Sequence, residues 1–202
     1  MTPEVAHGRL RKRDSHLWKR DPLDYYIEPR WCSERLFATE TFTGAVWDSA
    51  CGSGRIVEAA QSAGILAMAS DIENRHPERG RVWVNRRDFL DFDPAWDLPD
   101  NIVSNPPFGI AERFVAHALK LARGKVAMLL PTKWIQGDKR SRWLATTPLR
   151  RVLFLAPRPS MPPGAVIEAG ESPGGGKEDY AWFIWEIGYR GPWEGGWLRR
   201  DV

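Results

Sequence analysis

The 202 residues suit one domain with a sizeable core, and 43% hydrophobic with 27% charged residues are typical of an ordinary globular protein. No apolar run reaches the ~20 residues of a membrane helix, and the basic N-terminus lacks a signal-peptide core, which predicts a cytoplasmic protein with no membrane partner. The net charge is a modest +3, and two cysteines without CxxC spacing predict neither a disulfide framework nor a metal site.

The chain is expected to begin with a basic, flexible arm over residues 1–22, because Lys and Arg residues are concentrated there. A single domain is expected over residues 23–190, and a C-terminal tail over residues 191–202. No segment could form a separate target-recognition domain. The protein is expected to be a monomer or a weak homodimer.

Short apolar runs alternate with amphipathic segments along this domain. Seven strands are predicted, over residues 44–48, 65–70, 82–84, 101–104, 125–130, 151–156 and 180–187. Helices are predicted over residues 31–37, 56–63, 114–122 and 139–145. The alternation indicates an α/β fold with a mostly parallel sheet and helices on both faces. The sixth and seventh strands are separated by a Pro/Gly-rich stretch rather than a helix, which predicts an antiparallel last strand.

Glycine and polar residues follow the first four predicted strands. Gly52 and Gly54 follow the first, Asp71 closes the second, Asp88 follows the third, and Asn105 follows the fourth. Because ligands of such sheets bind beyond the carboxyl ends of the strands, these residues are expected to share one site. The Gly-x-Gly turn alone fits either a nucleotide site or a simple strand–helix turn.

The tetrapeptide Asn105-Pro106-Pro107-Phe108 combines amide-type acceptor oxygens with a flat ring in a turn stiffened by two prolines. This combination suits an enzyme that grips a planar amino group and methylates it. A strand-terminating turn is the alternative interpretation of the tetrapeptide taken alone.

The chain resembles S-adenosylmethionine-dependent methyltransferases that modify amino groups. Asp48-Ser49-Ala50-Cys51-Gly52-Ser53-Gly54 resembles their first motif, with Ser49 where proline is usual, and Asn105 to Phe108 resembles their catalytic motif. Tyr26-Ile27-Glu28-Pro29 looks like the cofactor-lining segment of DNA adenine-N6 enzymes. Residues 158–164 and 179–183 look like small phage or prophage methyltransferases, which would act in the host cytoplasm. The resemblance covers roughly residues 24 to 188 and implies a Rossmann-like class I methyltransferase fold.

The resemblance implies S-adenosylmethionine as cofactor, S-adenosylhomocysteine as product, and no metal. It assigns the methionine end to the first motif and the pocket closure to the upstream segment. Asp71 would bind the ribose hydroxyls, Asp88 would accept from the adenine amino group, and Ile72 and Phe89 would lie beside the adenine. The cofactor residues implied are Tyr26, Glu28, Pro29, Asp48, Ala50, Cys51, Gly52, Gly54, Asp71, Ile72, Asp88, Phe89 and Asn105.

The catalytic residues implied are Asn105, Pro106, Pro107 and Phe108. The Asn105 side-chain oxygen and the Pro106 carbonyl would each accept one amino hydrogen, and Phe108 would stack on an extruded base. Basic clusters favour DNA, single- or double-stranded, with Lys133, Trp134, Lys139, Arg140 and Arg142 as candidate contacts. The predicted function is therefore transfer of a methyl group to the N6 amino group of adenine in DNA, with short or loose sequence recognition.

Three alternatives stay open. Methyltransferases of RNA adenine and of a glutamine amide in a translation factor use the same tetrapeptide logic. An inactive nucleic-acid-binding subunit is the alternative from another class, and the intact Asn105 and Gly52–Gly54 turn oppose it.

Overall fold

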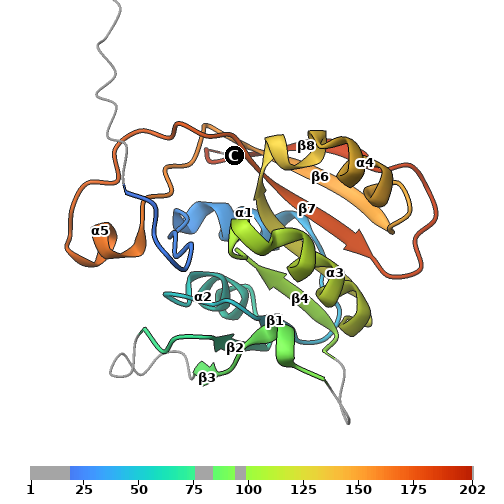
Figure 1. The fold of residues 1–202 in the computed structure, drawn as a ribbon, viewed down its shortest axis with the longest axis horizontal. Helices are drawn as coiled ribbons and strands as arrows, with labels where there is room; N and C mark the ends of the chain where they lie inside the picture. Colours follow the sequence, from blue (N-terminus) through green and yellow to red (C-terminus); the bar gives the residue numbers. More distant parts are fainter. Residues whose placement is uncertain (1–18, 76–83, 94–98, 202) are drawn as a thin grey trace, which may run out of the picture.

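A computed structural model describes residues 19–75, 84–93 and 99–201 and contains one eight-stranded sheet in the order β3-β2-β1-β4-β5-β7-β6-β8 (Figure 1). The strands are β1 (Val46–Asp48), β2 (Ala67–Asp71), β3 (Val84–Arg86), β4 (Asn101–Ser104), β5 (Lys125–Pro131), β6 (Leu149–Ala156), β7 (Tyr180–Glu186) and β8 (Glu194–Arg199). Strands β1 to β5 pair in parallel, and β7 is antiparallel to both β5 and β6. The predicted mostly parallel α/β sheet is confirmed.

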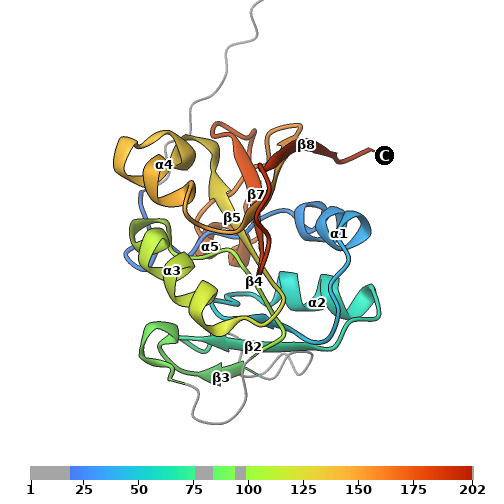
Figure 2. The ribbon, with the colours of Figure 1, turned by 90° about the vertical axis from the view of Figure 1, so that its right-hand side faces the viewer.

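Helices cover both faces of this sheet, as predicted. Figure 2 shows α1 (Arg30–Thr39) and α2 (Arg55–Ser62) on one side, and α3 (Ala111–Leu121) and α4 (Asp138–Leu144) on the other. Short elements complete the described part: α5 (Gly164–Glu168) and the 3-10 turns η1 (Phe89–Asp91), η2 (Phe108–Ile110) and η3 (Thr132–Gln136). No helix within the described ranges is long and apolar enough to cross a membrane.

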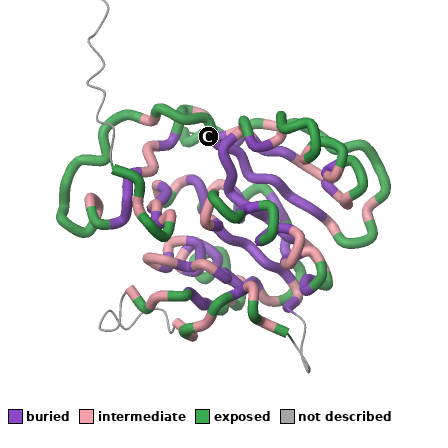
Figure 3. The backbone as a smooth tube through the Cα atoms, viewed as in Figure 1, coloured by how far each residue is buried: buried purple, intermediate pink, exposed green. Residues whose placement is uncertain are grey.

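The alternation of side chains along the central strands divides the core into two layers. Met128 of β5 and Phe183 of β7 pack on the side of α3, whereas Leu129 and Trp182 pack on the side of α1 and α2. Strands β5 and β7 are therefore apolar on both faces, as expected where helices cover both sides of a sheet. Figure 3 shows this buried centre and the exposed loops around it.

The C-terminal segment differs from the prediction. Residues 191–202 were expected to be a tail outside a seven-stranded sheet, but Glu194–Arg199 form β8, an eighth strand parallel to β6. Leu198 is buried beneath α1, and the ring of Trp197 lies 5.3 Å from that of Phe154. Two glycines in this strand weaken its sequence signal, so its pairing rests on these long-range contacts.

Two further expectations meet the limits of the described residues. Residues 1–18 of the expected basic arm lie outside them. The third strand was expected over residues 82–84; β3 occupies Val84–Arg86, and residues 82–83 are not described.

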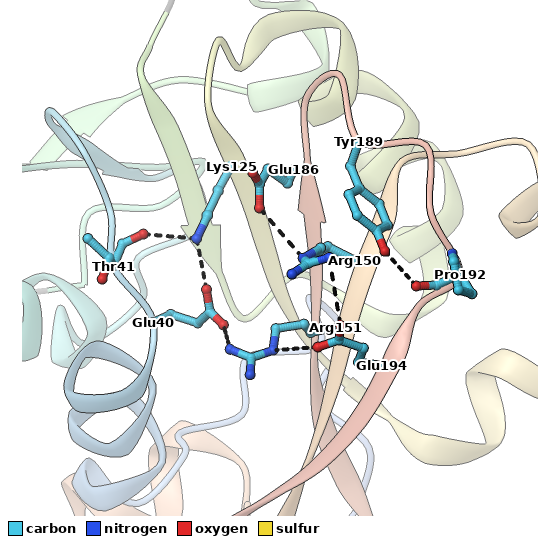
Figure 4. Close-up of polar contacts among 9 residues, drawn as sticks. All are labelled: Glu40, Thr41, Lys125, Arg150, Arg151, Glu186, Tyr189, Pro192 and Glu194. Carbon is cyan, nitrogen blue, oxygen red and sulfur yellow. Dashed lines mark hydrogen bonds and ion pairs between the residues drawn. The ribbon is translucent and has the colours of Figure 1, made fainter.

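A buried carboxylate joins α1 to the sheet end opposite to the strand ends that carry the motifs (Figure 4). Glu40, with 4% of its side chain exposed, accepts from Lys125 Nζ at 2.8 Å and also pairs with Arg151. Arg151 Nε in turn lies 3.9 Å from Glu194 of β8. The two cations compensate the buried negative charge of Glu40. Together with Glu194, these ion pairs link the end of α1 to β5, β6 and β8.

Glu40→Gln is expected to lower the free energy of unfolding by about 1–3 kcal/mol, because two cations lose a buried charge that accepts their hydrogen bonds. Urea unfolding followed by tryptophan fluorescence measures the change. Glu194→Gln is the matched control, since its side chain is 55% exposed and the expected cost is below about 1 kcal/mol. Equal effects of the two substitutions would contradict the role of Glu40.

Candidate active site

The carboxyl ends of β1, β2 and β4 meet at one cavity, called here the first cavity. Most of the predicted cofactor residues line it: Tyr26, Glu28, Asp48, Ala50, Cys51, Gly52, Asp71, Ile72, Asp88, Phe89 and Asn105, together with the predicted catalytic Pro107. Pro29 and Gly54, the residues directly before α1 and α2, are not in the lining. The structure thus brings the strand-end residues together.

The glycine turn after β1 requires glycine for two reasons. Gly52 and Gly54 have φ angles of +48° and +79°, which side chains rarely adopt. A Cβ atom on Gly52 would also lie 2.7 Å from the ring of Tyr25. The turn is braced by Asp71, whose carboxylate accepts from Gly52 N at 2.8 Å and from Glu73 N at 2.9 Å.

Asp48 carries a buried oxygen that lacks a hydrogen-bond partner among the described residues. Its Oδ1 accepts from Ser104 Oγ at 2.7 Å, but its buried Oδ2 accepts from no described donor. Burial raises the pKa of Asp48 well above its ordinary value, opposed by the Ser104 hydrogen bond. An unpaired acceptor in a cavity wall suits a ligand that brings a donor or a positive charge.

The side chain of Asn105 has a fixed orientation. Its Nδ2 donates to the Tyr26 carbonyl oxygen and to Glu28 Oε2, both at 3.0 Å. Both amide hydrogens are therefore used, and Oδ1 is left as the acceptor, with no described donor on it. Glu28 is itself buried and accepts from Ser33 Oγ at 3.5 Å.

Glu28 therefore acts on Asn105, a role that the sequence did not predict. Burial raises the pKa of Glu28, and the hydrogen bonds and the nearby Arg55 partly offset this rise. Arg55 also donates to the backbone carbonyl of Glu28. A long-range amide–carboxylate pair has no local sequence pattern, so only the fold reveals it.

Phe108 lies in a different place from the rest of its motif. It lines a second cavity of about 580 Å³, together with Tyr26, Lys133, Tyr180 and the loops around residues 159–162 and 173–175. The Phe108 ring stacks on Tyr26 with centroids 6.0 Å apart and planes at 10°, and its centroid lies 5.8 Å from that of Tyr180. Tyr26 borders both cavities.

The remaining predicted cofactor residues occupy the far side of the first cavity. Asp88 Oδ1 accepts from Leu90 N at 2.9 Å and so begins η1. Phe89 is buried and packs against Trp47, whereas Ile72 is 47% exposed. The first cavity therefore offers carboxylates at Asp48, Asp71 and Asp88 and an apolar surface beside them.

The prediction for Trp134 is wrong. Its ring is buried in the core, 5.5 Å from Phe183, because η3 folds back between the end of β5 and α4. Arg140 stacks on this ring at 4.9 Å and donates to the Trp134 carbonyl at 2.8 Å. The Trp134 ring is therefore not available to a base, and the Arg140 side chain is 29% exposed.

The other candidate nucleic-acid residues lie at the surface. Lys133 lines the second cavity and pairs with Glu178 at 3.0 Å, with both side chains more than half exposed. Arg142 pairs with Asp138 on α4, and Lys139 is exposed on the same helix. These exposed pairs are weak and exchangeable.

Metal-ligand chemistry is not found within the described ranges, where no group of three or more His, Cys, Asp or Glu side chains could hold a metal ion. Cys32 and Cys51 are both free and buried. Tyr25 and Arg75 are two of the cavity residues that sequence reasoning missed, and the Arg75 guanidinium lies 4.0 Å above the Tyr25 ring. Neither residue has a motif of its own.

No protein-family model and no curated protein sequence matches the chain. Solved structures do match. A Listeria monocytogenes protein named as a class I S-adenosylmethionine-dependent methyltransferase is 12% identical with a TM-score of 0.51, over 84% of this chain and 62% of that one. The 23S rRNA methyltransferase ErmE is 13% identical with a TM-score of 0.53, over 82% and 70%.

The M protein of the type I restriction enzyme EcoKI is 14% identical with a TM-score of 0.51. The match covers 80% of this chain but 44% of that one, so this chain spans less than half of that protein. Identities this low establish the fold alone. The chain has the Rossmann-like fold of class I S-adenosylmethionine-dependent methyltransferases.

Proposed function

We propose that this protein uses S-adenosylmethionine to methylate the N6 amino group of adenine in DNA, with short or loose sequence recognition. The observation that carries the proposal is the Asn105 amide, whose two hydrogens are held by Tyr26 and Glu28. Its Oδ1 is thereby left as an acceptor on a residue that lines the first cavity, three residues before Phe108, which lines the second. In the proposed complex the target amino group donates to that oxygen.

The first cavity fits S-adenosylmethionine. Among the described residues Asp48 Oδ2 has no hydrogen-bond partner, which suits the methionine ammonium group, and the glycine turn lines the same cavity through Gly52. Asp71 suits the ribose hydroxyls, with Ile72 and Asp88 beside the adenine. When bound, the cofactor supplies a methyl group already activated on a sulfonium sulfur.

The acceptor atoms directly after β4 favour attack by a planar amino nitrogen. The lone pair of that nitrogen is delocalised into the base, so it is a poor nucleophile. Asn105 Oδ1 and the Pro106 carbonyl can each accept one amino hydrogen and so favour a tetrahedral nitrogen. These fixed dipoles also stabilise the positive charge that develops on the nitrogen as it gains a methyl group.

The second cavity suits a base taken out of a nucleic acid. The rings of Phe108, Tyr26 and Tyr180 form an aromatic part of its lining, and Lys133 adds a cation there. DNA is favoured over RNA by the resemblance of residues 158–164 to phage methyltransferases. The M protein and ErmE show that this fold serves proteins named for DNA restriction and for rRNA methylation.

Asp48→Asn is expected to change stability and ligand affinity in opposite directions. It removes a buried carboxyl whose raised pKa reflects the cost of its charge, so the melting temperature at pH 8 should rise. It also removes the charged acceptor for the cofactor ammonium, so calorimetric affinity for S-adenosylhomocysteine should fall about 10- to 100-fold. A fall in both quantities would assign Asp48 a purely structural role.

Asn105→Ala is expected to lower kcat about 10²- to 10³-fold, because the acceptor oxygen is lost, with the affinity for S-adenosylhomocysteine changed less than about threefold. Single-turnover methyl transfer and calorimetry measure the two quantities. A matched pair tests the orientation of the amide: Glu28→Gln keeps an acceptor for Nδ2 and should retain far more activity than Glu28→Ala. Full activity of Asn105→Ala would refute the mechanism.

The substrate is tested by transfer of a tritiated methyl group to DNA, RNA and protein in parallel, with the products hydrolysed and identified. The expected product is N6-methyldeoxyadenosine from DNA, and modification-aware sequencing should show a short or degenerate motif. Label only in RNA adenine or in glutamine would transfer the assignment to those substrates. A long, strict DNA motif would contradict the proposed loose recognition.

A further inference from the structure

Tyr25 is wedged between two glycines that belong to distant segments. A Cβ atom on Gly52 of the first-cavity turn would lie 2.7 Å from the ring, and one on Gly164 of α5 would lie 1.9 Å from it. Tyr25 is 9% exposed and lines the first cavity. The space between Gly52 and Gly164 is filled by the Tyr25 ring. Movement of the ring therefore requires movement of one of the two segments.

The Pro/Gly-rich segment, residues 157–176, is attached to the chain around Tyr25 by three hydrogen bonds. Gly164 N donates to the Tyr25 carbonyl at 2.9 Å and Ile27 N donates to the Pro162 carbonyl at 3.2 Å, and these two bonds form the antiparallel bridge between Tyr26 and Pro163. The Tyr25 hydroxyl donates to Glu168 Oε1 at 2.9 Å. Figure 1 shows α5 and its loops extending beside the N-terminal segment, away from the sheet.

The Pro/Gly-rich segment also forms one wall of the second cavity. Residues 159–162 and 173–175 line that cavity opposite Phe108 and Tyr180. In the part of the chain that the structure describes, no strand pairing holds this segment to the main sheet, and α5 is only five residues long. The shape of the second cavity therefore depends on where the segment is held, and Tyr25 is one of its attachments.

A residue of the first cavity also contacts the Tyr25 ring. The Arg75 guanidinium lies 4.0 Å above Tyr25, and its buried Nε has no hydrogen-bond partner among the described residues. Arg75 lines the first cavity, four residues after Asp71 ends β2. A ligand that meets Asp71 and the glycine turn would lie beside Arg75 and would restrict both the guanidinium and the ring beneath it.

We infer that Tyr25 is a positioning residue through which the cofactor, bound in the first cavity, fixes the Pro/Gly-rich segment and thereby the wall of the second cavity. The inference rests on the proposed use of S-adenosylmethionine. It makes the acceptor cavity complete only when the cofactor is present. Binding of the cofactor and of the extruded base would then favour each other, as coupled sites must.

The test uses the cofactor product alone, so it does not depend on the identity of the acceptor. A glutamate-specific protease can cut the full-length protein after exposed Glu171, within the Pro/Gly-rich segment. Saturating S-adenosylhomocysteine is expected to slow cleavage of the Glu171–Ser172 bond about three- to tenfold in the wild type. This factor corresponds to stabilising the closed form of the segment by about the net contribution of one hydrogen bond. Mass spectrometry of the fragments measures the rate.

Two substitutions should remove this protection by different routes. Tyr25→Phe deletes the hydroxyl that binds Glu168, and Gly164→Ala places a methyl group where the ring lies. Gly175→Ala is the matched control in the same segment, because its added Cβ meets nothing within 4 Å, and it should keep the protection. All rates are compared at saturating ligand, so a weaker affinity does not imitate the result.

The outcomes separate the inference from the function on which it rests. Two results would overturn the role of Tyr25 and leave the proposed function intact. One is a wild type that binds S-adenosylhomocysteine in calorimetry but is not protected from cleavage. The other is protection in Tyr25→Phe and Gly164→Ala that equals protection in the wild type. Absence of binding to the wild type would overturn both. Loss of protection in both variants, with retention in Gly175→Ala, is the supporting result.

Discussion

The orientation of one side-chain amide is the constraint on which the candidate active site depends. An amide presents an acceptor on one side and donors on the other, and only the acceptor side can hold the hydrogens of an amino group. The Tyr26 carbonyl and the Glu28 carboxylate both take hydrogens from Asn105 Nδ2, which leaves Oδ1 as the acceptor side of the amide. Because a reversed amide would lose both bonds, the acceptor is preorganised before any substrate arrives.

The buried carboxyl groups that hold the Asn105 amide and line the first cavity lower the stability of the fold. Glu28 and Asp48 are both buried, and burial raises the pKa of each carboxyl, while each negative charge disfavours the other. The cavity thus accumulates acidic groups with few compensating cations, in contrast to Glu40, which two cations satisfy at the opposite end of the sheet. A cationic ligand would offset part of this cost. The buried acidic groups therefore favour ligand binding over packing as the role of the cavity.

Local patterns predicted what depends on local geometry. Strand alternation, the glycine turn before α2 and the polar residues Asp71 and Asn105 at strand ends follow from short-range rules, and the fold confirmed them. The mistakes have a different origin. Trp134 stands among basic residues in sequence yet is buried beneath α4, and β8 forms through pairing with a strand about forty residues earlier. Contacts across such distances are decided by packing, which residue order does not display.

Tyr25 and Glu28 belong to the same class as these mistakes. Each acts through a partner more than seventy residues away, Gly164 and Glu168 for Tyr25 and Asn105 for Glu28. Both residues lie in one short stretch before α1, so that stretch touches the Asn105 amide, the glycine turn and the Pro/Gly-rich segment together. A segment with three such contacts cannot move without disturbing all three.

The two prolines of the tetrapeptide explain how a single strand end serves two cavities. Asn105 ends in the first cavity and Phe108 in the second, three residues later, with Pro106 and Pro107 between them. Proline restricts its own φ and the conformation of the residue before it, so the backbone between Asn105 and Phe108 has few conformations. The proposed acceptor and aromatic ring are therefore joined by a stiff backbone, whereas the Pro/Gly-rich segment, which also lines the second cavity, is proposed to be the adjustable part. Rigid chemistry on one side and an adjustable wall on the other suit an enzyme that must hold one nitrogen in place while tolerating varied surroundings.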